Sequence, residues 1–513
     1  MLDGALRVAA AKTSTASVRR SLNTMVIVLI PSVIVGVGIA KYGSQTHQIV
    51  KFIGAVIVLG VLALAATRPA LALVALVALS PLDAQNTFLG AHLRVSDELL
   101  LTMAVLLLPR LATSTKDVSR WLVIGLISLV GGAVVSAIFA DESRTAAWGA
   151  VKYAAFAVVV VVGTSLCKQN PRLRTRMVIA FLAATSLTAL LGLLQGWGYD
   201  TIVGAPYLPG LPNSLLGYYT DYAALIGMGF AVGAALFISQ RSKLSPSGIA
   251  TMGALLLLAV AIAEAKSRGG VVTATVGLAV AVIGQGSVFR HVGRLAAVAA
   301  IAVGVYVMMP AHITRPVVQR LTDHSLTAYD DQQRHGVQAL GLRLLRSHPL
   351  GIGYGNFSLY EPPSLYFSNG LPDFHDQETF FQIGLDSGWL GLAGFCVIGA
   401  AALSRLGRLR TDPLVMAGTA GLAGLAAQGL NDYVIYDVPL LMATGFMLML
   451  AFGNPESVVA TTSGRNTFRR RQPSPGSSNV SGSASGKTSQ QFVVAAEPSR
   501  SSMSLSPRGD NLP

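Results

Sequence analysis

Apolar segments recur along most of the chain, and short polar connections separate them. Many are close to the roughly 20 apolar residues that a helix needs to cross about 30 Å of hydrocarbon. This pattern predicts an all-α, polytopic helical membrane protein with about 12–14 transmembrane helices. The expected spans are residues 24–41, 49–66, 69–82, 97–111, 120–139, 151–167, 177–195, 215–238, 248–265, 269–285, 293–309, 379–403, 413–430 and 436–453.

The longest break in this pattern divides the chain into parts. It gathers Arg, His, Asp, Glu, Tyr and Gly in one place, so we expect the chemistry of the protein there. After residue 453 the chain becomes rich in Ser, Gly and Pro, which is typical of disorder. The expected parts are a cytoplasmic N-terminal tail (1–23), transmembrane helices (24–309), a large extracytoplasmic catalytic loop (310–378), C-terminal transmembrane helices (379–453) and a disordered cytoplasmic tail (454–513).

Composition supports the membrane assignment, since only 12% of the residues are charged and 52% are hydrophobic. The net charge of +14 is spread in short clusters between apolar segments. That distribution is typical of the positive-inside bias of cytoplasmic loops and argues against nucleic-acid binding. With the N-terminus inside, the basic clusters fall on the cytoplasmic side and the 310–378 loop falls outside. The two cysteines, Cys167 and Cys396, offer no disulfide framework.

Two polar residues stand at the edges of predicted spans. Arg268 lies in a very short outside turn, where an arginine is either functional or an interfacial residue that reaches the headgroups. Asp221 lies near the start of a span, and such an acid usually faces the interior of the bundle, for function or for a structural ion pair. Position alone leaves both pairs of alternatives open.

Within the large loop, Arg334 begins a helix-like segment with apolar residues at helical spacing. This pattern predicts an amphipathic helix, suited to lying on the membrane surface, that ends at His348 and Pro349. The sequence GIGYGNF then predicts a turn that brings the backbone close to another part of the protein. Its residues of interest are Gly351, Gly353, Tyr354 and Gly355.

His375 precedes the span 379–403, with Asp376 and Glu378 beside it. A histidine there can accept a proton from an attacking hydroxyl, and a neighbouring carboxylate can orient it. The alternative is an exposed loop histidine. The acids around His375 match no defined metal site in their spacing. The chain also lacks a Walker A loop, a Rossmann glycine fingerprint and a His-Glu-x-x-His zinc helix.

Taken together, these segments resemble the signature of the O-antigen ligase and polymerase superfamily. The resemblance consists of an arginine and a helix, a glycine-rich turn that begins with Pro-Leu, a variable loop with a histidine, and a final acid-x-Gly element. Two positions depart from the pattern, because Asp376 replaces the usual asparagine and Asp386 replaces the commoner glutamate. The matching residues are Arg334; Pro349, Leu350, Gly351, Gly353, Gly355 and Phe357; His375; Asp386, Gly388, Trp389, Leu390 and Gly391; and, more loosely, 267–269 and 212–223.

The resemblance implies a metal-independent glycan ligase or polymerase in the cytoplasmic membrane, with its active site on the extracytoplasmic side. The donor would be a saccharide on a polyprenyl diphosphate and the acceptor a glycan or glycolipid, with no cofactor. Arg268 and Arg334 would hold the diphosphate, because guanidinium forks bind such anions, and His375 would activate the acceptor hydroxyl. The expected substrate-binding residues are Gly351, Gly353, Tyr354, Gly355, Asp376, Glu378 and Asp221.

Two other functions remain open at this point. A flippase for lipid-linked glycans would share the many spans, and a scaffold for envelope assembly would use the Ser-rich tail for docking. Within the enzyme class, the sequence does not choose between ligase and polymerase.

Overall fold

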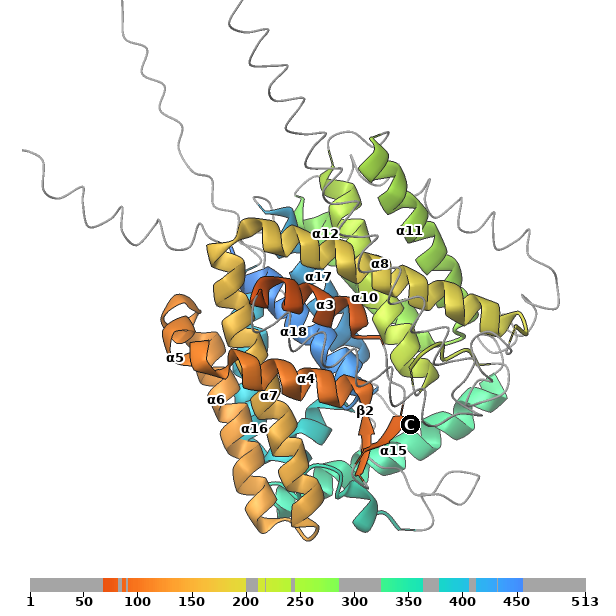
Figure 1. The fold of residues 1–513 in the computed structure, drawn as a ribbon. Helices are drawn as coiled ribbons and strands as arrows, with labels where there is room; N and C mark the ends of the chain where they lie inside the picture. Colours follow the sequence, from red (N-terminus) through yellow and green to blue (C-terminus); the bar gives the residue numbers. More distant parts are fainter. Residues whose placement is uncertain are drawn as a thin grey trace, which may run out of the picture. The chain divides into compact units, whose positions relative to one another are not determined.

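The structure is a computed structural model, and it confirms a polytopic helical fold (Figure 1). It describes residues 68–81, 85–88, 91–199, 211–216, 218–240, 245–285, 324–362, 378–405, 412–430 and 432–454. Side chains are described for these residues except 85–88, 91–95 and 324–333. The predicted spans 24–41, 49–66 and 293–309 and the two predicted tails lie outside the described residues, apart from Asn454.

The helices follow the hydropathy pattern closely. Among the described residues, seven helical segments are long and apolar enough to cross a membrane, and four apolar helices are shorter. The elements are α3 (Pro69–Leu79), β1 (Gln85–Phe88), β2 (Ala91–Arg94), α4 (Val95–Leu107), η1 (Leu108–Arg110), α5 (Leu111–Ser114), η2 (Thr115–Asp117), α6 (Arg120–Phe139), α7 (Ser143–Gln169), α8 (Pro171–Gly196), α10 (Tyr219–Ser239), α11 (Pro246–Glu264), α12 (Arg268–Gly284), α15 (His324–Ser347), η3 (Phe357–Leu359), α16 (Thr379–Leu403), α17 (Pro413–Gln428) and α18 (Val438–Phe452).

One small sheet departs from the prediction of helices alone. Strands β1 and β2 pair antiparallel, with Gln85 opposite Arg94 and Phe88 opposite Ala91. The hairpin lies in the polar connection between the predicted spans 69–82 and 97–111, so it adds to the helical fold without replacing a span. The helix α3 that precedes it is correspondingly short, with 11 residues.

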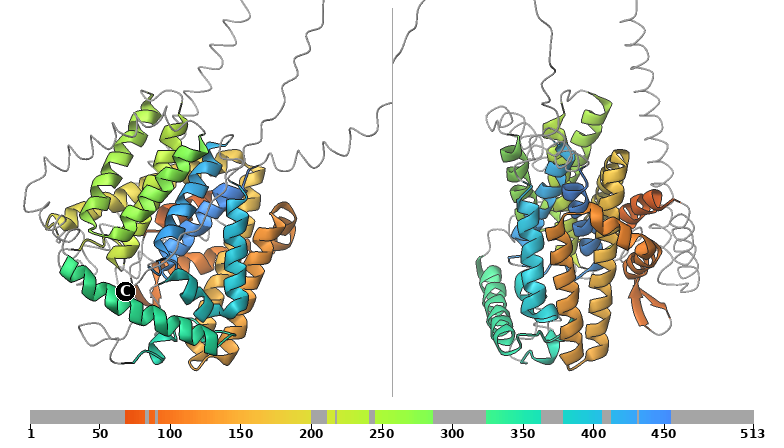
Figure 2. Two further views of the ribbon diagram at one scale, coloured as in Figure 1. Left: turned by 180° about the vertical axis from the view of Figure 1, so that it is seen from behind. Right: turned by 90° about the vertical axis from the view of Figure 1, so that its left-hand side faces the viewer.

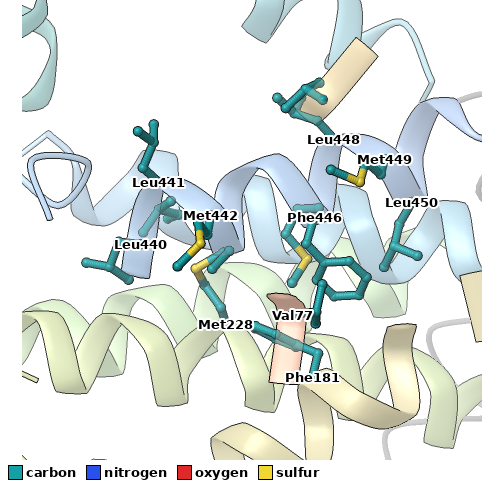
Figure 3. Packing of buried hydrophobic residues seen from close by; sticks show 14 of the residues in the cluster. Val77, Phe181, Met228, Leu440, Leu441, Met442, Phe446, Leu448, Met449 and Leu450 are labelled. Atoms are coloured by element: carbon teal, nitrogen blue, oxygen red, sulfur yellow. The ribbon is translucent and has the colours of Figure 1, made fainter. Parts of the chain in front are cut away.

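Helix α18 is the centre of the described bundle. All its residues from Val438 to Phe452 are buried, and it contacts α3, α4, α7, α8, α10, α16 and α17. Figure 3 shows Met442 and Phe446 of α18 beside Met228 of α10 and Phe181 of α8. A helix that is apolar on every side is one that protein covers on every side, which explains why α18 shows no amphipathic stripe.

Glycines allow α6 and α16 to pack with their backbones in contact. A methyl group on Gly132 would meet the backbone of Gly391, with the nitrogen at 2.5 Å, and one on Gly125 would meet the carbonyl oxygen of Gly394 at 2.8 Å. Small residues are the usual means by which helices approach closely in membranes, where hydrophobic burial between helices is weak.

The helices run in both directions along the bundle, which has two ends. At what we call the site end, α12 and α16 begin and α17 ends; the Thr379 nitrogen of α16 donates to the Gly429 carbonyl oxygen after α17 at 2.9 Å. At the opposite end, α8 and α17 begin and α18 ends. There Arg174 of α8 pairs with Asp412 at 2.8 Å and donates to the Leu450 carbonyl oxygen at 2.9 Å.

Helix α15 lies outside the bundle and beside α16 in both views of Figure 2. It ends at Ser347, before Pro349, as predicted, but it begins at His324 and not at Arg334. Its apolar face, with Val337, Leu344 and Leu345, packs with Leu385 of α16. The amphipathic pattern was therefore correct, and the described part of its apolar face covers protein.

Candidate active site

The carboxylate of Asp432 is the meeting point of three elements at the site end. Its Oδ1 pairs with Nη1 of Arg334 on α15 at 2.9 Å, and its Oδ2 accepts a hydrogen bond from Gln428 Nε2 of α17 at 3.2 Å. Gln428 is in turn held by Thr273 of α12, whose hydroxyl donates to Oε1 at 2.6 Å. The Arg334 side chain is 31% exposed, so it remains open to a ligand.

The first turn of α12, which starts at Arg268, lies against the same carboxylate. A methyl group on Gly269 would stand 2.5 Å from Asp432 Oδ2 and 2.7 Å from Gln428 Nε2. Ser267 caps the helix by accepting from the Gly270 nitrogen at 3.5 Å. The turn between α11 and α12 thus brings the positive end of a helix dipole to the Arg334–Asp432 pair, and exposed Arg268 is the first residue of that helix.

The start of α16 holds the backbone of the same segment. The Thr379 hydroxyl donates to the Asp432 carbonyl oxygen at 2.9 Å and accepts from the Val434 nitrogen at 3.4 Å. Glu378 precedes Thr379 in the capping position and is half-buried, and this burial raises the pKa of its carboxyl above the usual value. Glu378 therefore belongs to the site end with Arg334 and Arg268.

His375 and Asp376 lie outside the described residues. In the sequence, two residues separate His375 from Glu378. Their predicted roles at the site therefore remain predictions.

The glycine turn docks into a break in α16, and this contact is the close approach that the sequence predicted. At Gly388 the backbone leaves helical geometry, with φ 66° and ψ −176°. The freed groups find partners in the turn: the Leu385 carbonyl oxygen accepts from the Ile352 and Gly353 nitrogens at 2.7 and 3.2 Å, and the Trp389 nitrogen donates to the Pro349 carbonyl oxygen at 3.0 Å.

The three glycines of this turn have a structural role, because they allow the turn to pack against α16. Gly351, Gly353 and Gly355 all have positive φ, a conformation that favours glycine. A methyl group on Gly351 would meet the backbone of Gly388 at 2.7 Å. Among the described residues, these glycines have no recorded contact with Asp432, Gln428 or Arg334. Their predicted contact with substrate therefore remains a prediction.

Tyr354 belongs to a neighbouring aromatic group. Its ring stacks on Tyr436 at 5.0 Å between centroids, and Lys152 Nζ of α7 lies 3.4 Å from its hydroxyl. Lys152 is itself paired with Asp97 of α4 at 3.0 Å. Burial raises the pKa of the Tyr354 phenol well above its usual value. Tyr436 follows Asp432 by four residues, so the group borders the site end.

Asp221 is buried in the first turn of α10, as expected for an acid that faces the bundle interior. This turn packs on the first turn of α12, where a methyl group on Gly270 would meet Ala223 at 2.8 Å. Asp221 therefore stands on the element next to Arg268, and its predicted contact with substrate remains a prediction.

Sequence reasoning missed Asp432, Gln428 and Thr379. The available signal was the connection 431–435, which carries an acid and no lysine or arginine. Among the described residues, no group of three or more His, Cys, Asp or Glu side chains could hold a metal ion.

These features define a multi-pass helical membrane protein with a polar site at one end of its bundle. Residues 253–396 match the family model described as O-antigen ligase, and this range contains Arg268, Arg334 and the glycine turn. No curated protein matches the chain. The match supports membership of the O-antigen ligase superfamily and an O-antigen ligase-type function in polysaccharide biosynthesis, on lipid-linked glycans in a membrane.

Proposed function

We propose that this protein transfers a saccharide from a polyprenyl-diphosphate-linked donor to a glycan acceptor, on the outer face of the cytoplasmic membrane. The observation that carries the proposal is the convergence of Arg334 and the Arg268 end of α12 on Asp432. Two arginines and a helix N-terminus form a positive site suited to a diphosphate.

The distribution of charge supports the outer face. The opposite end of the bundle has basic residues at several helix ends, including Lys168 in the last turn of α7, Arg172 and Arg176 on α8, and Arg405 after α16. Short loops rich in Lys and Arg stay in the cytoplasm. The site end is then extracytoplasmic, where lipid-linked saccharides and surface acceptors meet.

The reaction needs no external energy source, because the donor is already activated. The acceptor hydroxyl oxygen forms a bond to the anomeric carbon, the bond from that carbon to the diphosphate oxygen breaks, and the diphosphate leaves on the polyprenyl lipid. His375 takes the hydroxyl proton, and a direct displacement inverts the anomeric centre. Arg334 and Arg268 stabilise the negative charge that grows on the leaving oxygen.

Asp432 explains how Arg334 is ready for the donor. Asp432 holds the guanidinium of Arg334 through Nη1, and a guanidinium presents its five N–H donors in a fixed fork that suits a diphosphate. The carboxylate also balances part of the positive charge of Arg334.

The test is transfer by purified protein in detergent, with lipid-linked donor and glycan acceptor. We expect Arg334→Ala, Arg268→Ala and His375→Ala each to lower the rate by about 100-fold or more, as loss of a transition-state contact does. Arg334→Lys should still lose about 10-fold, because a lysine does not reproduce the fork. Arg343→Ala is the matched control, since Arg343 is an exposed arginine on the same helix.

The outcomes separate the alternatives. An enzyme releases polyprenyl diphosphate and makes a new glycosidic bond, whereas a flippase leaves the covalent structure unchanged. A scaffold would lose its function in cells on deletion of residues 460–513, a change that should leave transfer in detergent intact. Normal transfer in all three alanine variants would reject this site.

A further inference from the structure

The carboxylate of Asp386 is fully enclosed in the bundle and accepts three hydrogen bonds from three elements. Oδ2 accepts from the hydroxyls of Tyr433 at 3.0 Å and Tyr153 of α7 at 3.1 Å. Oδ1 accepts from Gln382 Nε2, one turn earlier in α16, at 2.6 Å. The Asp386 side chain is 1% exposed, so it does not touch a substrate from solvent.

One of these partners leads directly to the proposed site. Tyr433 follows Asp432 in the chain, and Thr379 binds the backbone on both sides of Tyr433. Helix α16 therefore holds this segment at two levels: Thr379 fixes its backbone, and Asp386 fixes the Tyr433 side chain two turns deeper. The Asp432 carboxylate, on the residue before Tyr433, pairs with Arg334.

We propose that Asp386 is a positioning residue for glycan transfer, which acts through Tyr433 to set Asp432 and thereby Arg334. The inference rests on the proposed function of the Arg334 site. It adds to that function the residue that keeps the diphosphate-binding arginine in its productive place.

The choice of a carboxylate fits this role. A buried acid in a membrane bundle is costly, and apolar side chains would fill the space at lower cost. A carboxylate, however, can accept from two hydroxyls on one oxygen and an amide on the other, and so fixes three side chains in direction.

Asp386 also stands on rigid backbone. The carbonyl oxygen of the preceding residue, Leu385, accepts hydrogen bonds from the glycine turn, and α16 breaks at Gly388, two residues after Asp386. The backbone that carries the Asp386 carboxylate is therefore held in place by the glycine turn, and the carboxylate in turn holds the Tyr433 side chain. Small errors in the placement of a catalytic group cost large factors in rate, so this anchoring matters for turnover.

The matched pair Tyr433→Phe and Tyr153→Phe tests the proposal. Each variant keeps its ring and removes one hydroxyl from the same carboxylate oxygen, but only Tyr433 adjoins Asp432. We expect Tyr433→Phe to lower kcat for glycan transfer by about 10-fold with donor KM changed by less than about threefold, since the lost interaction acts in the transition state. Tyr153→Phe should keep both parameters within about threefold of the parent.

A second measurement guards against a simple loss of folding. Asp386→Asn keeps an oxygen for the tyrosine hydroxyls, and Gln382 can turn its amide to accept from the new NH₂ group. The two Asp386 variants are compared at a temperature at which both remain folded. There we expect Asp386→Asn to retain more transfer activity than Asp386→Ala. In the double variant Asp386→Ala with Tyr433→Phe, the second substitution should lower kcat little further, because both substitutions remove the same hydrogen bond between Asp386 and Tyr433.

Arg334→Ala separates the two proposals. Suppose that Arg334→Ala abolishes transfer. The site then stands, but the positioning role is wrong if Tyr433→Phe matches the parent. It is also wrong if Tyr433→Phe and Tyr153→Phe lower kcat by the same factor. If Arg334→Ala transfers normally, Arg334 has no part in transfer and the positioning role through it fails, whereas a parent protein that transfers no saccharide would overturn the proposed function itself.

Discussion

Replacing Gly388 by alanine should disrupt the contact between α16 and the glycine turn. The backbone of Gly388, at φ 66° and ψ −176°, lies in a region that is essentially restricted to glycine. A β-carbon there would also stand 2.6 Å from the Leu350 carbonyl carbon and 2.7 Å from its oxygen. Both atoms belong to the backbone of the turn, so no flexible side chain can move aside.

The size of the effect follows from these two terms. Backbone strain of this kind costs about 1–3 kcal/mol. Relief of the clash requires the turn to move, which weakens the hydrogen bonds from Ile352 and Trp389 that satisfy the break, at about 1 kcal/mol each. We expect a total loss of about 3–5 kcal/mol, and a fall in Tm of about 3–5 °C.

The chain offers both a control and a probe. A β-carbon added at Gly399, on the same helix, would meet no heavy atom within 4 Å, so Gly399→Ala should be neutral or slightly stabilising. Cys167 is buried and Cys396 is exposed. In a Cys396→Ser background, a thiol-reactive fluorophore therefore reports unfolding through Cys167 during a thermal ramp in detergent.

A Gly388→Ala variant that melts within about 1 °C of the Gly399→Ala variant would refute this reasoning, since a fall of about 3–5 °C is expected from the strain and the weakened hydrogen bonds together. It would mean that α16 can run through residue 388 as a regular helix. The docking of the turn would then be an accessory contact and not part of the frame of the site.

Two further predictions concern the surroundings of this frame. Burial and the hydrogen bond to Asp141 raise the pKa of Tyr360 from 10.0 to about 12. The neutral phenol therefore stabilises the fold below pH 10, and this contribution is lost as the pH rises through about 12. The Tm advantage of the parent over Tyr360→Phe should disappear across that window. Gly132→Ala should lower the Tm by several degrees, because its new methyl group would clash with Gly391. Gly131→Ala is the control and should not lower the Tm, since the nearest neighbour of its methyl group would be 4.0 Å away. Equal Tm values for the two variants would contradict the packing argument.

Much of the fold was open to prediction because hydropathy reports the environment of each helix directly. Helices α6 and α16 begin and end at the predicted residues 120–139 and 379–403, and α12 is displaced by one residue from 269–285. The end of α15 and the glycine turn were also predictable, since Pro349 stops a helix and glycines permit positive φ. These signals are all local in sequence.

The parts that escaped prediction depend on distant partners. Arg334 and Asp432 are 98 residues apart, and Tyr153 and Asp386 are 233 apart. No periodicity in either segment announces such a pair, because a hydrogen bond between elements leaves no trace in either one alone. The hairpin of β1 and β2 was missed for a different reason: its strands are four residues each, too short for alternation to stand out.

Helix α16 links the separate parts of the site more directly than any arginine does. Its start holds the Asp432 backbone through Thr379, its middle holds Tyr433 through Asp386, its break receives the glycine turn, and its flank packs on the helix that carries Arg334. A disturbance of α16 should therefore displace Asp432 and Arg334 together, whereas a change at Arg268 removes one charge and leaves the rest in place. The proposed positioning role thus gives a purpose to the buried acid and the backbone break in α16, features that are costly in the bilayer.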